Sequence, residues 1–244
     1  MDPDVYQEMA RTEDRHWWFR GRRAILLSVI DQLGLSPGSM ILEAGAGTGG
    51  NLAMLSDFGR VCAVEMDATA RAFATEKYQG RFDIRTGSFP AEIPFADERF
   101  DLICFLDVLE HIDVDVDSLS AAKRLLRDGG RILVTVPAHA WLWSAHDARH
   151  HHVRRYNAAE LSAKARNAGL EIVQLSYFNT TLFPLAIVAR YIFGQSPRFG
   201  TAIPPEPVNR LFYWLFSAER FLLRAVRLPF GLSLLAVLAA PSRG

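Results

Sequence analysis

A run of closely spaced glycines constrains this chain more than any other feature. From Ile41 to Gly50 the sequence reads Ile-Leu-Glu-Ala-Gly-Ala-Gly-Thr-Gly-Gly, an apolar pair and an acid followed by the glycines. Glycine lacks a Cβ atom, so it permits positive φ angles and lets a ligand approach the main chain closely. The pattern therefore predicts a strand that turns sharply into a helix, with a cofactor-binding loop at the turn.

The glycines alone do not identify the cofactor. Gly45, Gly47 and Gly50 also satisfy the G-x-G-x-x-G fingerprint of dinucleotide-binding proteins. Two acids favour S-adenosylmethionine: Glu43 precedes the first glycine, and Glu65 closes the next apolar run, where a carboxylate can accept hydrogen bonds from both ribose hydroxyls. Because that contact also suits NAD, both cofactors stay open at this point, as does a strand-turn-helix without a ligand.

Composition narrows the class of protein. The chain has 244 residues, half of them hydrophobic, which suffices for one sizeable α/β domain and makes a second full domain unexpected. Twenty-seven basic residues balance 27 acidic ones, so we expect no nucleic-acid partner. Cys62 and Cys104 each lie in an apolar run, where we expect them to be buried and reduced.

No segment has the pattern of a secretory signal or of a membrane span. The first 20 residues open with acids and lack an apolar core, and the apolar runs 182–193 and 232–240 are shorter than the roughly 20 residues that a spanning helix needs. We therefore expect a cytoplasmic protein, with peripheral contact to the inner face of a membrane as an open alternative.

Beyond the glycine loop, strand-like runs alternate with helical ones. The expected strands are 61–64, 82–86, 101–106, 131–136 and 170–178, and the expected helices are 24–33, 51–56, 68–78, 118–127 and 157–169. This alternation predicts a doubly wound, Rossmann-like α/β fold, with helices on both faces of a mostly parallel sheet. Ligands bind outside the carboxyl ends of such strands, where Glu43, Glu65, Ser88 and Asp107 fall.

Five motifs, in this order and spacing, resemble those of class I S-adenosylmethionine-dependent methyltransferases, of the type 11/12-like group that includes ubiquinone-pathway and natural-product enzymes. The resemblance covers roughly residues 36–178. It rests on Glu43–Gly49, on Glu65, on Ile93–Phe95 leading to Phe100–Leu102, on Leu106–His111 and on Leu125–Gly130. An NAD-dependent dehydrogenase is not expected to carry the last three.

The resemblance implies where the cofactor would lie. The glycine-loop backbone would hold its methionine and ribose parts, Glu65 would accept the ribose hydroxyls, and Asp107 would lie beside the methionine amino group. Ser88 and Phe89 would flank the adenine, although the family more often has Asp where Ser88 stands. The expected cofactor-binding residues are Glu43, Gly45, Ala46, Gly47, Gly49, Glu65, Met66, Ser88, Phe89, Leu106 and Asp107.

An aromatic and basic segment precedes the glycine loop. His16-Trp17-Trp18-Phe19-Arg20-Gly21-Arg22-Arg23 interleaves rings with arginines. Core aromatics are one interpretation. The other is a lid whose rings cover the ligand and whose guanidinium meets a carboxylate, for which Trp18 and Arg23 are our candidates. We expect residues 1–35 to form this lid and the first helix.

The segment after the fifth strand holds five of the seven histidines. It leaves the sheet beside the cofactor site, so we expect it to reach the acceptor. A histidine general base is our hypothesis, because imidazole titrates near neutral pH: His146 positioned by Asp147, and His152 as second choice. A structural loop is the alternative, and His146 with His150 and Asp147 would also suit a divalent cation, although we expect no metal. The expected substrate-binding residues are His111, Trp141, Trp143 and Tyr156.

The family pattern leads us to expect a seventh, antiparallel strand at 232–238, after a helical insertion at 181–228. The core domain would then comprise residues 36–180 and 229–244. The insertion is expected to hold helices over 182–193, ended by Gly194, and 208–227, with a basic stripe formed by Arg210, Ser217, Arg220, Arg224 and Arg227. We expect the insertion to cap the pocket. A homodimer face, a membrane contact through 208–228 and an ordinary core helix remain alternatives.

Together these features predict an enzyme that moves the methyl group of S-adenosylmethionine to an oxygen, nitrogen or carbon nucleophile, releasing S-adenosylhomocysteine. The aromatic residues favour a small, apolar or lipid-like acceptor. Two alternatives remain: a non-catalytic scaffold or membrane-associated binding module that keeps the cofactor fold, and an NAD-dependent oxidoreductase.

Overall fold

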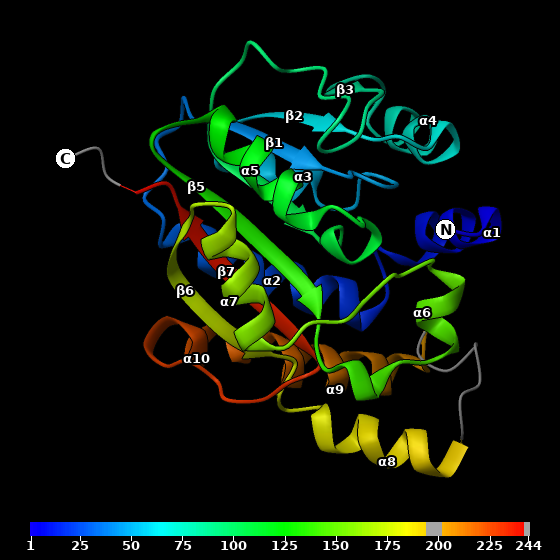
Figure 1. Ribbon diagram of the computed structural model, residues 1–244. Helices are drawn as coiled ribbons and strands as arrows, with labels where there is room; N and C mark the ends of the chain where they lie inside the picture. The colour runs from blue at the N-terminus through cyan, green and yellow to red at the C-terminus, as the bar shows by residue number, and fades with distance from the viewer. Residues whose placement is uncertain (194–201, 242–244) are drawn as a thin grey trace.

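The computed structural model describes residues 1–193 and 202–241 and is built around a seven-stranded sheet (Figure 1). The strand order is β3-β2-β1-β4-β5-β7-β6. β7 runs antiparallel to both of its neighbours, while the other pairings are parallel. The strands are β1 (Met40–Ala44), β2 (Arg60–Val64), β3 (Asp83–Arg85), β4 (Phe100–Leu106), β5 (Leu126–Pro137), β6 (Glu171–Phe178) and β7 (Ser233–Ala239). The Rossmann-like sheet with a final antiparallel strand is thus confirmed.

Alternating side chains give the sheet two apolar faces. In β4, Ile103 and Phe105 join the core on one face, while Leu102, Cys104 and Leu106 join the core on the other. This alternation follows from the two-residue period of a strand. Because both faces are buried, the central strands read in the sequence as continuous apolar runs.

Helices cover both faces. One core includes side chains of α5 (Asp115–Leu125) and α7 (Ala158–Asn167). The opposite core includes side chains of α2 (Trp17–Asp31), α3 (Leu52–Ser56), α9 (Glu206–Ser217) and α10 (Glu219–Ala225). The remaining elements are α1 (Pro3–Thr12), α4 (Ala68–Lys77), η1 (Leu109–His111), η2 (Ala140–Leu142), α6 (Ala145–Arg149) and α8 (Phe183–Phe193).

The helix expected over 24–33 begins seven residues earlier, at Trp17. The His16 side chain accepts a hydrogen bond from the Trp18 amide, and Asn209 of α9 accepts one from the Trp17 amide at 2.8 Å. These bonds satisfy amides that a helix start leaves without partners. One of the two capping side chains lies 192 residues away in the sequence. The local sequence pattern therefore could not predict where this helix begins.

Residues 126–130 form part of β5 rather than the end of a helix. α5 ends at Leu125, and Leu126 already pairs with Phe100, ahead of an irregularity in the β4–β5 register. Gly129 has φ of +79°, and a Cβ at Gly130 would lie 2.9 Å from the Phe100 carbonyl oxygen. The two glycines therefore allow the irregular start of β5. The helix expected over 118–127 begins three residues earlier than predicted.

The single helix expected over 208–227 is two helices that meet at Ala218. The buried Glu219 at the start of α10 accepts hydrogen bonds from the amide and hydroxyl of Thr181, both at 2.8 Å. The expected basic stripe is interrupted, because Ser217 is buried. Arg224 pairs with Asp31 of α2 at 2.8 Å, and both of these side chains are at least half exposed. Gly194, expected to end α8, lies outside the described residues. No helix in the described part of the chain has the length and hydropathy needed to cross a membrane.

Candidate active site

A cavity of about 960 Å³ opens at the carboxyl ends of the central strands. Its walls come from α1, α2, the glycine loop, the ends of β2, β4 and β5, and the segment that carries α6. Leu182, Leu185 and Ala186 near the start of α8, together with Phe212 of α9, also line it. Segments far apart in the sequence thus share one space.

The glycine loop forms a close-fitting cradle. Gly45 and Gly47 have φ of +70° and +55°, and a Cβ at Gly45 would lie 2.8 Å from Val108. The amides of Gly45 and Ala46 donate to the Val64 carbonyl oxygen, which ties the loop to β2. Only glycine suits the first position, because any side chain there would collide with Val108.

Glu65 completes this side of the cavity. Its carboxylate accepts hydrogen bonds from the amides of Gly47, at 2.7 Å, and Asp67, at 2.8 Å. Burial raises the pKa of Glu65, although those two amide hydrogen bonds oppose the shift. Each carboxylate oxygen keeps accepting capacity for a further donor, such as a ribose hydroxyl. Gly45 to Asn51, together with Glu65 and Met66, are called the glycine-loop wall below.

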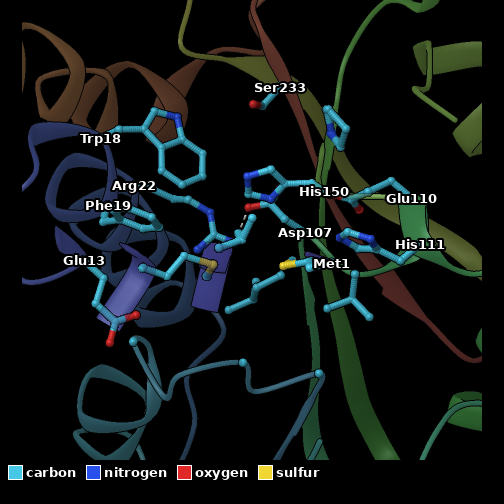
Figure 2. Close-up of a pocket in the computed structure, with 18 of the residues that line it drawn as sticks. Met1, Glu13, Trp18, Phe19, Arg22, Asp107, Glu110, His111, His150 and Ser233 are labelled. Carbon is cyan, nitrogen blue, oxygen red and sulfur yellow. Dashed lines mark ion pairs between the residues drawn. The ribbon is translucent and has the colours of Figure 1, made fainter. Parts of the chain in front are cut away.

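An ion pair crosses the floor of the cavity. Arg22 of α2 meets Asp107 at 2.6 Å and donates to Thr135 at 3.1 Å (Figure 2). The Trp18 ring lies over Arg22, with 5.4 Å between the guanidinium carbon and the ring centroid. Arg23, the arginine favoured from the sequence, instead donates to the carbonyl oxygens of Glu13 and Gly50. Arg22 is therefore the guanidinium that faces the cavity centre.

Glu43 lies beneath this floor. It is 1% exposed, does not line the cavity, and accepts a hydrogen bond from Asn51 at 2.7 Å. Asn51 in turn accepts one from Arg22 at 3.3 Å. Burial raises the pKa of Glu43 to about 8, while the Asn51 hydrogen bond and the Arg22 charge oppose the shift.

The N-terminal helix α1 joins the two sides of the cavity. Near its carboxyl end, the buried Glu13 accepts a hydrogen bond from Thr48 of the glycine loop at 2.7 Å. Nearer its start, Asp4 and Glu8 pair with Arg149 of α6 at 2.5 and 2.9 Å. The sequence did not predict this helix, although residues 1–35 were expected to form a lid. Its two anchors suit that role, which stays a prediction.

Four imidazoles form the opposite side, called the histidine wall below: His111, His146, His150 and His152, all of which line the cavity. Ring centroids lie 4.0 Å apart for His146 and His150, and 4.7 Å apart for His111 and His152. Burial lowers the pKa of His146 to about 4 and that of His111 to about 3, and His152 adds to both shifts. Both rings are therefore neutral at pH 7.

Asp147 supports His152 rather than His146. Its carboxylate lies 2.9 Å from His152 Nδ1 and accepts two hydrogen bonds from Arg155, at 2.7 and 2.9 Å. Burial alone would raise the pKa of Asp147, but the hydrogen bonds from His152 and Arg155 lower it below its usual range. Asp147 is fully buried and does not line the cavity, so it acts through its neighbours.

The expected cofactor residues lie close together at the cavity. Trp18, Arg23, Gly45, Ala46, Gly47, Glu65, Met66, Ser88, Phe89, Leu106 and Asp107 all line it. Gly49 lies behind the loop, where a Cβ would meet Ala74 and Tyr78 at 3.1 Å. The glycine positions and Glu65 are therefore where the pattern placed them.

The expected substrate-binding residues do not lie together at the cavity. Of the four, His111 alone lines the cavity. Trp141 and Trp143 are 61% and 39% exposed and lie outside its lining, and Tyr156 is buried in the core, where its hydroxyl donates to Asp115 at 2.8 Å. Tyr156 thus anchors the start of α7 rather than reaching the cavity.

Comparison with known proteins identifies the family. Residues 18–175 match the family model described as methyltransferase domain. A protein of Mycolicibacterium smegmatis, named a probable S-adenosylmethionine-dependent methyltransferase, is 30% identical over 162 residues, which are 65% of this chain and 61% of the relative. A demethylmenaquinone methyltransferase of Beutenbergia cavernae is 35% identical over 121 residues, covering 50% and 47%. The chain thus matches about half to three fifths of the length of these relatives.

The chain belongs to the class I, S-adenosylmethionine-dependent methyltransferase family. Its fold agrees with that assignment. A chain of the complex between the Haloferax volcanii Trm112 methyltransferase activator and a methyltransferase superposes with a TM-score of 0.63 and 19% identity, covering 99% of this chain and 96% of that one.

Several residues of this methyltransferase's cavity were not singled out from the sequence. Arg22 was passed over for its neighbour, although spacing on a helix that begins at Trp17 would have placed Trp18 and Arg22 on one face, four residues apart. Glu13 carried no signal of its own and Glu110 appeared only as part of the Leu106–His111 motif, although both are buried. His150 was noted only for its spacing from His146.

Proposed function

We propose that this protein transfers the methyl group of S-adenosylmethionine to a nucleophile on an acceptor with an apolar body. The observation that carries the proposal is the single cavity bounded by both the glycine-loop wall and the histidine wall. Cofactor and acceptor can share this space, and holding two reactants in line supplies much of the rate enhancement in such reactions.

The glycine-loop wall suits the cofactor. Its cradle has no room for a Cβ at Gly45, Glu65 has oxygens for the ribose hydroxyls, and Ser88 and Phe89 line the adenine side. Arg22 would exchange part of its contact with Asp107 for the methionine carboxylate, which a guanidinium binds through paired hydrogen bonds. When bound, the cofactor supplies an activated methyl group on its sulfonium sulfur.

The histidine wall suits the acceptor. His146 is neutral and lines the cavity, so it would accept the proton that the nucleophile loses as the methyl group arrives. Leu142, Leu182, Leu185 and Phe212 supply apolar lining beside it. A quinol-like ring is the acceptor class that we favour, with support from the relatives named demethylmenaquinone methyltransferases.

The surface of α9 and α10 supports contact with an anionic membrane. Leu211, Trp214 and Phe221 are exposed there, beside arginines that include Arg210 and Arg227. Sedimentation with phosphatidylglycerol vesicles tests this contact, and the double variant Trp214→Ser, Phe221→Ser should reduce it. Binding that survives the double variant, or that neutral vesicles match, would contradict it, and dimerisation through this face would appear in gel filtration.

Calorimetric titration with S-adenosylhomocysteine tests the cofactor site. We expect micromolar binding by the wild-type protein and none by Gly47→Arg. A Cβ at Gly47 meets only Met9, at 4.0 Å, so the arginine has room to extend into the cavity. Glu65→Gln keeps the shape of the carboxylate and should weaken binding about tenfold, which provides a second variant if Gly47→Arg fails to fold.

Methyl transfer is then measured with methyl-labelled S-adenosylmethionine and short-chain hydroquinones. Labelled product with the wild-type protein and none with Gly47→Arg would support the proposal. Tight cofactor binding with no transfer to any acceptor would favour the non-catalytic scaffold, and binding of NAD in its place would favour the oxidoreductase.

A further inference from the structure

Three side chains of the histidine wall and its neighbour η1 converge inside the cavity. Glu110 and His111 belong to η1 and His152 follows α6, yet one ligand atom from each lies within 4.8 Å of the other two. Figure 2 shows Glu110 and His111 next to each other, on the opposite side of the pocket from Trp18 and Glu13. A carboxylate oxygen and two imidazole nitrogens form a donor set that suits divalent transition metals.

Glu110 is held in place without a hydrogen-bond partner for one oxygen. The residue is 1% exposed and lines the cavity, and its Oε2 is buried and has no hydrogen-bond partner among the described residues. Burying a carboxylate oxygen in this way is costly unless a cation or a proton compensates it.

His152 is oriented as a ligand. Its Nδ1 lies 2.9 Å from the Asp147 carboxylate, whose oxygens also accept hydrogen bonds from Arg155 and Ser144. Nδ1 is therefore the ring nitrogen that donates to the carboxylate, which leaves Nε2 as the nitrogen available to a metal ion. Metal-binding histidines usually show this arrangement, in which a carboxylate fixes the ring and its tautomer. Arg155 and Ser144 hold Asp147 in turn, through hydrogen bonds of 2.7 to 3.0 Å.

Neighbouring histidines offer further nitrogen ligands to a metal ion, and the nearby arginines do not compete with it for the Glu110 carboxylate. The His150 ring lies 5.8 Å from that of His152, and the His146 ring lies 6.3 Å from it. Both rings line the same cavity. His150 can supply a fourth nitrogen, while His146 stays available to accept a proton. Two arginines near the site are already paired, Arg155 with Asp147 and Arg22 with Asp107. The set differs from the His146, His150 and Asp147 combination that sequence spacing suggests, because Asp147 lies behind the wall.

We propose that Glu110, His111 and His152 bind one divalent transition-metal ion of the zinc class, which holds an oxygen of the acceptor in the cavity. Metal–ligand bonds of about 2.1 Å bring donor atoms to roughly 3.5 Å from one another. The three side chains therefore need shifts of about an ångström to close on the ion. Three protein ligands leave a coordination position open toward the cavity, as in catalytic zinc sites.

The ion's role in the reaction rests on the methyltransferase function proposed above. A hydroxyl oxygen of the acceptor would coordinate the cation, which makes its proton more acidic. That proton passes to His146. The oxygen then forms the new bond to the methyl carbon as the methyl–sulfur bond breaks, and the electron pair of that bond stays on sulfur. The acceptor class is accordingly a phenol or hydroquinone with a free hydroxyl.

Cobalt titration tests the site without relying on activity. The full chain is stripped with a chelator, and Co²⁺ is added while its visible absorption is recorded. We expect one Co²⁺ per chain in a site of low symmetry, displaced by one equivalent of Zn²⁺. Glu110→Gln and His152→Ala should each weaken Co²⁺ binding at least tenfold, because each removes a ligand.

His151→Ala is the matched control. His151 lies in the same run of three histidines, but its side chain is 58% exposed and meets Asp2 instead of the cavity. This variant should bind Co²⁺ as the wild-type protein does. Glu110→Gln has nearly the shape of glutamate, so it reports on the ligand even if His152→Ala unfolds. Absent binding, or equal affinity in all three variants, would overturn the proposal.

The same protein samples separate this proposal from the methyltransferase function. Co²⁺ binding that is lost in the ligand variants, without S-adenosylhomocysteine binding, would leave the metal site standing and contradict the function. Methyl transfer that continues at an undiminished rate after the chelator treatment would remove the ion from the reaction and leave the function intact.

Discussion

The two walls of the cavity are built in different ways. The glycine-loop wall consists of strand ends and the turns that follow them, and its key hydrogen bonds join residues such as Gly47 and Glu65, which follow the neighbouring strands β1 and β2. The histidine wall lies beyond the sheet, and ion pairs such as that of Arg155 with Asp147 hold it together. Sheet geometry therefore dictates the first wall, while side-chain pairs particular to this chain determine the second.

This difference indicates how the fold divides its tasks. Under the proposed function, the first wall would serve a cofactor that every member of the family shares, so generic backbone geometry suffices. The second would serve an acceptor that varies between enzymes, and it can change without disturbing the sheet. Variants in one wall should therefore leave the function of the other nearly unchanged.

The largest effect is expected for His146→Ala. Loss of the base should lower turnover by about 10²–10⁴-fold, while S-adenosylhomocysteine affinity changes less than about twofold because the glycine-loop wall is untouched. Steady-state kinetics and calorimetry on the same sample measure both, with His151→Ala as the control. Unchanged turnover would exclude His146 from the mechanism.

Asp147→Ala should unfold the protein more readily, because it leaves Arg155 buried without its partner. Loss of one member of a buried ion pair costs about 3–5 kcal/mol of stability. Urea denaturation measures this cost. The exposed pair of His151 with Asp2 should contribute less than about 1 kcal/mol, and His151→Ala measures it. Equal effects would mean that the wall does not depend on the buried pair.

Arg22→Gln and Arg23→Gln compare the two neighbouring arginines of α2 that line the cavity. Arg22 faces Asp107 and the cavity centre, so its loss should weaken S-adenosylhomocysteine binding by about 10–100-fold. Arg23 bonds to backbone carbonyl oxygens, and its loss should act mainly on stability. Calorimetry distinguishes them, and a larger binding defect for Arg23→Gln would restore the assignment made from the sequence.

The smallest effect concerns Glu43 and pH. Its raised pKa, about 8, means that the carboxyl is mostly protonated at pH 7 in the free protein. The cationic cofactor favours the ionised form, so binding releases a proton, and affinity should rise with pH by at most tenfold per unit until about pH 8. Glu43→Gln should flatten this rise. S-adenosylhomocysteine, in which the sulfur is neutral, should show a weaker rise of affinity with pH. An equal pH dependence for both ligands would contradict this prediction.

The same group affects stability with the opposite sign. Because the folded pKa of Glu43 lies above its unfolded value, the folded state holds a proton that the unfolded state releases. The contribution of Glu43 to stability is therefore fully present below about pH 4.5 and is lost as pH rises toward 8.

Local pattern was enough to predict the sheet and the glycine-loop wall. The positions of Gly45, Gly47 and Glu65 follow from strand ends that are visible as apolar runs. The helix expected from residue 157 likewise forms, and it starts with a capping box in which Asn157 and Glu160 exchange hydrogen bonds of 2.9 Å. In each case the partners are close in sequence or on adjacent strands.

The features that the sequence did not predict depend on contacts between residues far apart in the chain. His111 meets His152 across 41 positions, and the start of α2 depends on Asn209. The expected partnership of Asp147 with His146 followed from adjacency in sequence, but successive residues of a helix point in different directions. Tyr156 was expected at the acceptor because its segment leaves the sheet beside the cofactor site, whereas its burial against Asp115 depends on how α5 and α7 pack.

The double anchoring of α1 has a consequence for kinetics. The same helix is tied to Thr48 of the glycine-loop wall and to Arg149 of α6, the helix that also carries His146. If α1 acts as the lid predicted from the sequence, it must move to uncover either wall. Both products would then leave through one opening event, and their release rates should rise together with ionic strength, since dissolved salt weakens the pairs between Arg149 and the acids of α1. One movement of α1 would then control the release of both products.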